Sequence, residues 1–210
     1  MNGSPEKQRL LKALFSKEYK SVSQKVPEAI LLDYAFYKGM EKKNNLKYKV
    51  AVETSIYCTI IQSDLMLTVK NLRLSTIELE KKFYARILSL TIYEYLKDLS
   101  SILGGELVNE LKENDFIELI DDVYILNKEF SDLRKIKEVI VKTIRHETIA
   151  HKKRNKIELI EQIFNIKEDE IYELGLDLIK LNNKLIAVSS KIRKRISEFH
   201  KINGQLKTKK

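Results

Sequence analysis

The sequence has few residues that interrupt secondary structure, with six glycines and two prolines in 210 residues. Collagen-like and low-complexity chains contain far more of both. β-Sandwiches and barrels need frequent glycine- or asparagine-containing turns between short strands. Hydrophobic residues make up 43% of the chain, enough to supply a core, so disorder throughout is excluded as well. We therefore predict an all-α protein, an up-and-down bundle with long core helices.

Cysteines and long apolar runs are also scarce. Cys58 is the one cysteine, so neither an intrachain disulfide nor a thiolate metal site can form. Its setting, SIYCTII, is typical of a buried and unreactive thiol. No Asp, Glu and His cluster stands out as a site for Mg²⁺ or Zn²⁺, so we expect no metal and no cofactor.

The sequence offers no segment for a membrane. The longest stretch without a charged residue, 54–63, is about half as long as a membrane span. The first residues are polar and lack the apolar segment of a secretory signal. We expect a cytoplasmic protein without a membrane partner.

Helical periodicity runs along most of the chain. Pro5 and Pro27 each precede a glutamate, a pattern typical of a helix start. Gly104–Gly105 predicts a helix end, and Ser131 predicts the N-cap of a later helix. The predicted helices cover about 6–20, 27–43, 46–74, 77–103, 132–153, 156–164 and 166–201.

Two segments leave alternatives open. Residues 105–130 carry eight acidic residues and two lysines, and we predict short helices and loops there, with a strand over 123–126 as the alternative. This acidic segment is either a lid or a spacer. The final helix carries a heptad-like apolar stripe that faces either the core, which we favour, or a partner helix. The stripe is Ile171, Leu174, Leu178, Leu181, Leu185, Val188 and Ile192.

We divide the chain into three parts. Residues 1–45 form N-terminal helices that pack on the core, 46–203 form the main helical domain, and 204–210 form a flexible basic tail. The short tail is the kind of terminus that frays.

Charge is segregated along the chain. The formal net charge is +9, yet 135–156 carries a local +6, 158–177 a local −6 and 191–210 a local +7. Alternating blocks are typical of solvated helix faces. A basic excess also permits a nucleic-acid partner. The block over 135–156 is distinctive because it contains two of the three histidines.

Those histidines follow an arginine in the segment RHETIAHKK, residues 145–153. Arg145 can bind a phosphate through two donors, and His151 can move a proton near neutral pH. The pair suits cleavage of an RNA phosphodiester without a metal. The spacing alone is weak, because Arg195 and His200 match it too.

Geometry limits what one copy of this pair can do. On a straight helix, Arg145 and His151 lie about 9 Å apart along the axis and about 120° apart around it. They converge if the helix bends or ends nearby, or if a second chain contributes its own pair. Otherwise they make caps or surface contacts.

The segment RHETIAHKK resembles the signature of the HEPN superfamily, in which an arginine and a polar residue precede a histidine. Here the polar residue is His146, and Ala150 is the small residue before His151. The helix over 83–104 resembles the second core helix of HEPN proteins from abortive-infection (AbiU-like) groups. The resemblance covers about 77–200.

The resemblance implies a helical bundle that forms a homodimer with both copies of the motif in one cleft. It implies metal-independent endoribonuclease activity in phage defence or a toxin–antitoxin system, with an antitoxin or defence-system protein as a further partner. Arg145 and His151 would be catalytic, with support from His146. Lys153 stands where some members have a tyrosine that is modified, so that regulation is not implied.

Further residues would serve the same cleft. Lys152, Lys153 and Arg154 would contact RNA phosphates, unless they form a solvated surface. Glu94, an acidic residue in an apolar helix, would either line the cleft or be hydrogen-bonded within the fold.

Two other functions compete. A HEPN-like module without catalysis would bind RNA or a protein partner. A DNA-binding regulator is disfavoured, because no helix-turn-helix pattern lies near the basic segments.

Overall fold

The computed structural model describes residues 5–44, 46–145 and 156–207, and all the regular structure in that part of the chain is helical. The long helices are α1 (Pro5–Lys42), α2 (Lys49–Leu74), α3 (Glu78–Ser101), α5 (Ile120–Arg145) and α7 (Glu168–Lys207). The short elements are η1 (Ile102–Glu106), α4 (Leu107–Glu113), η2 (Ile117–Leu119) and α6 (Lys156–Phe164).

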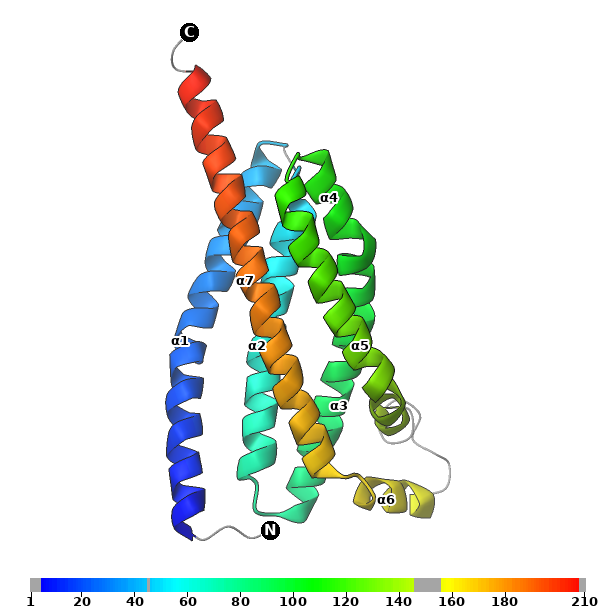
Figure 1. Cartoon of the computed structure of the whole chain (residues 1–210). Coiled ribbons are helices and arrows are strands. Elements are labelled where there is room, and N and C mark those ends of the chain that lie inside the picture. The colour runs from blue at the N-terminus through cyan, green and yellow to red at the C-terminus, as the bar shows by residue number, and fades with distance from the viewer. Residues whose placement is uncertain (1–4, 45, 146–155, 208–210) are drawn as a thin grey trace.

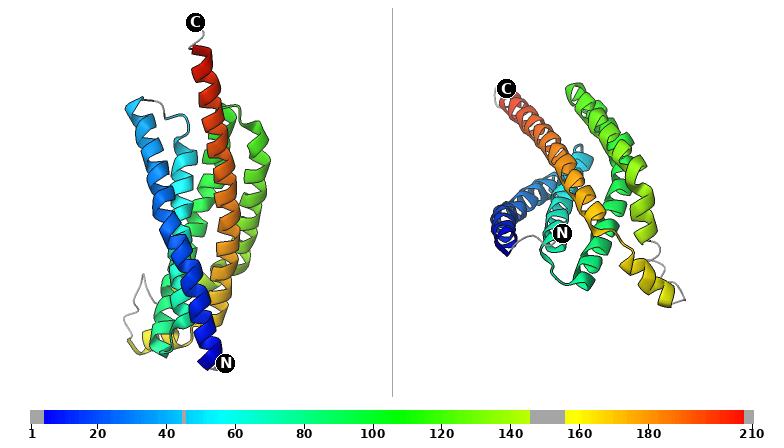
Figure 2. Two further views of the ribbon diagram at one scale, coloured as in Figure 1. Left: turned by 90° about the vertical axis from the view of Figure 1, so that its left-hand side faces the viewer. Right: turned by 60° about the horizontal axis from the view of Figure 1, so that its bottom comes forward.

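The long helices alternate in direction, so the predicted all-α, up-and-down bundle is confirmed (Figure 1). Helix α2 is central and packs against α1, α3 and α7, while α5 packs against α3 and α7. Figure 2 shows α6 at one end of the bundle, turned away from the long helices. In the part of the chain that the structure describes, no helix combines the length and apolar character needed to cross a membrane.

The apolar stripe of α7 faces the core of its own chain. Every residue of the stripe is buried, with at most 8% of its surface exposed. The core interpretation of the heptad-like spacing is therefore confirmed. Those residues are Ile171, Leu174, Leu178, Leu181, Leu185, Val188 and Ile192.

Buried polar groups link the three central helices. The Tyr95 hydroxyl of α3 donates to Oδ1 of Asn182 in α7. Nδ2 of Asn182 donates to the Cys58 carbonyl at 2.9 Å and to Oε1 of Gln62 at 2.8 Å, both in α2. Because an unpaired buried polar group is costly, this network favours one register of the three helices.

The break predicted between 20 and 27 is absent. Helix α1 runs without interruption from Pro5 to Lys42, with Pro27 inside it. Proline removes one backbone donor, but its fixed φ is compatible with a helix, so the turns on both sides continue. The chain does break near Asn44, as predicted, where φ is 49°.

The glycine pair does not end α3. At residue 102 the chain passes into the π-helical turn η1, which contains Gly104 and Gly105, and then continues as α4. The Leu107 amide donates to the Ile102 carbonyl across this wider turn. A π-turn accommodates one extra residue within a helix, so the glycines lengthen the path without ending it.

The second half of the acidic segment is helix, and the strand alternative over 123–126 is wrong. Helix α5 begins at Ile120, so the predicted start at 132 is also wrong and Ser131 is no N-cap. Val123, Leu126 and Phe130 are all buried, at spacings of three and four residues. This is the spacing of a helix that packs on a core.

The acidic segment pairs with the basic part of α7. Three ion pairs cross between them: Glu118–Arg195 at 2.8 Å, Asp122–Lys191 at 2.6 Å and Glu129–Lys184 at 2.7 Å. The residue numbers rise on one side as they fall on the other, as antiparallel packing requires. Part of the C-terminal positive charge is therefore balanced within the chain.

Candidate active site

Arg145 is the last described residue of α5. It lies one helical turn after the buried Val141, so the core packing of α5 turns Arg145 toward α3. Its Nε donates to Oε1 of Glu94 in α3 over 2.7 Å. The Arg145 side chain is 23% exposed and that of Glu94 is 38% exposed, so the ion pair lies at the surface with access from solvent.

The residue before Glu94 makes the second contact. The guanidinium carbon of Arg145 lies 4.9 Å from the centre of the Tyr93 ring. A guanidinium over an aromatic face gains a cation–π attraction. Two consecutive residues of α3 therefore hold Arg145, one at its edge and one at its face.

Sequence reasoning found Arg145 and Glu94 separately, and the structure brings them together. Of the two roles predicted for Glu94, the structure gives it a hydrogen bond, and the donor is the candidate catalytic arginine. Sequence reasoning missed Tyr93. An aromatic residue beside an acidic residue on a helix can bind an arginine through its ring and the neighbouring carboxylate. The sequence does not say which arginine binds there, because that depends on the packing of α3 on α5.

The rest of the motif lies outside the described residues. His146, His151, Lys152, Lys153 and Arg154 all fall within 146–155. Their predicted roles, catalytic for the histidines and phosphate-binding for the others, stay predictions.

The second match to the motif is engaged elsewhere. Nε of Arg195 donates to Glu118 at 2.8 Å, and its guanidinium lies 5.6 Å from the Phe116 ring centre. Arg195 thus joins α7 to the segment before α5. These contacts are of the same kind as those of Arg145, so they do not separate the two arginines. The sequence favours Arg145, because Arg195 is followed by the apolar Ile196 and His200 is preceded by the bulky Phe199.

A second carboxylate lies one turn along α3 from Glu94. The Tyr57 hydroxyl donates to Oδ2 of Asp98 over 2.7 Å. Burial, reinforced by the hydrogen bond to Asp98, raises the pKa of Tyr57 far above its ordinary value. Each of the two carboxylates therefore has its own donor, Arg145 for Glu94 and Tyr57 for Asp98.

More positive charge lies along the same pair of helices. Lys97 of α3 and Arg134 of α5 border a small hollow of about 10 Å³, which Tyr93 also lines. Lys142, three residues before Arg145, is exposed. The surface beside Arg145 therefore suits a polyanion better than a neutral ligand.

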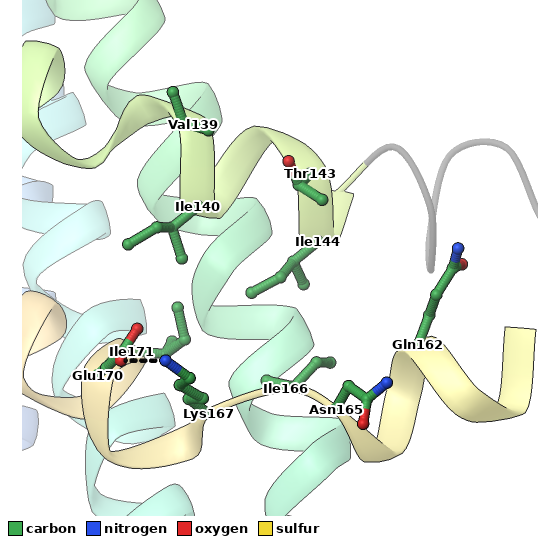
Figure 3. A pocket seen from close by; sticks show the side chains of 10 residues that line it. All are labelled: Val139, Ile140, Thr143, Ile144, Gln162, Asn165, Ile166, Lys167, Glu170 and Ile171. Carbon is green, nitrogen blue, oxygen red and sulfur yellow. Dashed lines mark hydrogen bonds and ion pairs between the residues drawn. The ribbon is translucent and has the colours of Figure 1, made fainter.

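An open cavity of about 450 Å³ lies between the end of α5, α6 and the start of α7. The side chains of Ile140 and Ile144 point toward Ile166 and Ile171 (Figure 3). The cavity is thus mainly apolar, and Arg145 is not part of its lining. Its remaining lining residues are Val139, Thr143, Gln162, Asn165, Lys167 and Glu170.

A buried lysine supports the wall of this cavity. Lys82 of α3 is 5% exposed, and its Nζ donates to the Ile166 carbonyl at 2.8 Å and pairs with Glu168 at 3.0 Å. These contacts fix the turn between α6 and α7 against α3. The cavity and the Arg145 site therefore share the end of α5, which contributes residues to both.

No protein-family model, curated protein or solved structure matches this chain. Within 5–44, 46–145 and 156–207, no three residues of the metal-binding types gather in one place. The residues of the site are therefore the basis for any function of this chain.

Proposed function

We propose that this protein is a metal-independent endoribonuclease of the HEPN type, which acts as a homodimer in the cytoplasm in phage defence or a toxin–antitoxin system. The observation that carries the proposal is the placement of Arg145. It stands at the start of the RHETIAH segment, at the surface, held by Glu94 and Tyr93. An arginine fixed in this way, beside further positive charge, supports a site for a phosphate.

The chemistry follows from the two residue types. His151 takes the proton of an RNA 2′-hydroxyl, and the 2′-oxygen attacks the neighbouring phosphorus. The bond from phosphorus to the 5′-oxygen breaks, and that oxygen receives a proton. Arg145 stabilises the negative charge that builds up on the phosphate oxygens. The products are a 2′,3′-cyclic phosphate and a free 5′-hydroxyl.

On a straight helix Arg145 and His151 do not share a face. A homodimer overcomes this, because each copy contributes its own arginine and histidine to one cleft. Exposed apolar side chains on α5 and α6, the helices that flank residues 146–155 in the sequence, support such an association. Ile136 and Val139 of α5 are 69% and 72% exposed, and Ile157 and Ile160 of α6 are 65% and 51% exposed. Large exposed apolar patches commonly mark an interface.

A cleavage assay with EDTA tests the proposal. Wild-type protein, Arg145→Ala and His151→Ala are incubated with single-stranded and structured RNA. Lys128→Ala, an exposed position of α5 far from Arg145, is the control for charge on the same helix. We expect cleavage by wild type and Lys128→Ala and at least a 100-fold loss in the other two. Equal cleavage by all four proteins would overturn the proposal.

A second function is favoured by one observation. Glu94 balances the charge of Arg145, as a structural arginine would be balanced. A HEPN-like module that binds RNA or a protein partner without cleaving would retain this pair. Steep salt dependence of RNA binding with no product would identify it.

A further inference from the structure

We propose that Glu94 is the positioning residue for Arg145, and this inference rests on the proposed ribonuclease function. A guanidinium has two edges that can bind an oxyanion, one that includes Nε and one formed by Nη1 and Nη2. Glu94 occupies Nε at 2.7 Å. The edge with Nη1 and Nη2 is then the one that takes two phosphate oxygens together.

The two contacts restrict different motions of the side chain. The hydrogen bond to Glu94 lies at the guanidinium edge and opposes rotation of its plane. The Tyr93 ring, 4.9 Å from the guanidinium carbon, supports one face. Because Tyr93 and Glu94 are adjacent on α3, one helix sets both constraints, and the arginine needs little reorganisation when a phosphate binds.

Glu94 has opposite effects on binding and on catalysis. Its negative charge beside a phosphate site weakens RNA binding, whereas its acceptor oxygen keeps the arginine in place for the reaction. Glu94→Gln removes the charge and keeps an acceptor. Glu94→Ala removes both. A residue that only stabilised α3 would not change RNA binding and RNA cleavage in opposite directions.

Asp98 provides the matched control. It lies one turn from Glu94 on α3, and its carboxylate accepts from Tyr57, not from Arg145. Asp98→Asn therefore removes the same charge from the same helix without touching the arginine. Thermal unfolding of each variant shows whether the fold is retained.

The experiment measures two quantities on the full chain in EDTA: single-turnover cleavage of an RNA, and the Kd for its 2′-O-methyl form, which lacks the reactive hydroxyl. For Glu94→Gln we expect a Kd about 2- to 5-fold lower than wild type and cleavage within about 3-fold. For Glu94→Ala we expect cleavage to fall by 10-fold or more. Asp98→Asn should cleave within about 2-fold of wild type.

Two results would overturn the assignment: cleavage by Glu94→Ala equal to wild type, or an equal loss in Asp98→Asn and Glu94→Ala. If wild type binds RNA but cleaves nothing, the proposed function fails. The Kd values for the 2′-O-methyl RNA then still test whether Glu94 positions Arg145. Both variants lack the charge and only Gln keeps an acceptor, so a Kd that is lower in Glu94→Gln than in Glu94→Ala supports the control of Arg145 by Glu94. Equal Kd values in the two variants refute it.

Discussion

Nη1 of Arg193 in α7 lies 2.6 Å from Oδ1 of Asp33 in α1. The other carboxylate oxygen of Asp33 accepts from the Ser55 hydroxyl of α2 at 2.8 Å. Asp33 is 4% exposed, so one buried carboxylate joins the first, second and last long helices. The attachment of α1 to the bundle thus depends on a charged contact as well as on apolar packing.

Asp33→Asn should destabilise the protein by about 2–3 kcal/mol, because it leaves the partly buried Arg193 without its counter-charge. Urea unfolding measures the free energy. Glu41→Gln is the control, since it breaks only the exposed pair Lys38–Glu41 on the same helix and should cost about 0.5 kcal/mol or less. Equal losses in the two variants would contradict this role of Asp33.

Gly175→Ala should destabilise the protein by about 1 kcal/mol. A Cβ at this buried position of α7 would lie 2.7 Å from Cγ2 of Val69 and 2.9 Å from Cδ2 of Leu88. Overpacking of about 1–3 kcal/mol then exceeds the gain in helix propensity of about 1 kcal/mol. At Gly39, within α1, a Cβ meets nothing within 4 Å.

Gly39→Ala is therefore the matched control and should stabilise the protein by about 0.5–1 kcal/mol. Thermal or urea unfolding of both variants gives the comparison. Stabilisation of the protein by both substitutions would show that the close crossing at Gly175 has no energetic effect.

The fold class and several elements could be predicted from local pattern. The bounds of α6, Lys156–Phe164, match the prediction, and so does the buried stripe of α7. The errors at Gly104 and Ser131 share one cause. Each residue carries a local signal for a helix terminus, and packing of the buried flanking residues Leu103, Leu107 and Phe130 overrides that signal. At Pro27 the fixed φ is compatible with a continued helix.

The site was predictable only in part. Arg145 was found because its segment combines residue types with a definite chemistry. Its partner Glu94 is 51 residues away in the sequence, and the pair forms only through the packing of α3 on α5. The crossing at Gly175 depends in the same way on contacts between distant helices.

Cys58 should resist alkylation in the native protein. It is fully buried, and burial raises the pKa of its thiol to about 11, so little thiolate is present at pH 8. Labelling with iodoacetamide, followed by mass spectrometry, should proceed only as fast as the protein opens and should become rapid in urea. Fast, complete labelling of the folded chain at pH 8 would contradict this prediction.

The carboxylate of Glu110 caps a helix from outside. This residue of α4 accepts from the backbone amides of Val50 at 2.7 Å and Ala51 at 2.8 Å, in the first turn of α2. Burial raises the pKa of Glu110 to about 6 from an ordinary 4.5, although the two amides act in the opposite direction. The folded state therefore holds the proton of Glu110 more tightly than the unfolded state does.

This difference predicts a pH-dependent stability. Between pH 4.5 and about 6 the folded protein binds more protons at Glu110 than the unfolded chain does, so the free energy of unfolding should fall as pH rises through this window. Other carboxylates titrate here too, so the measured quantity is wild type minus Glu110→Gln, from urea unfolding at pH 4 to 7.5. We expect this difference to decrease by about 1–2 kcal/mol and to level off above pH 7. A difference that stayed constant or rose across the window would show that burial does not favour the protonated form of Glu110.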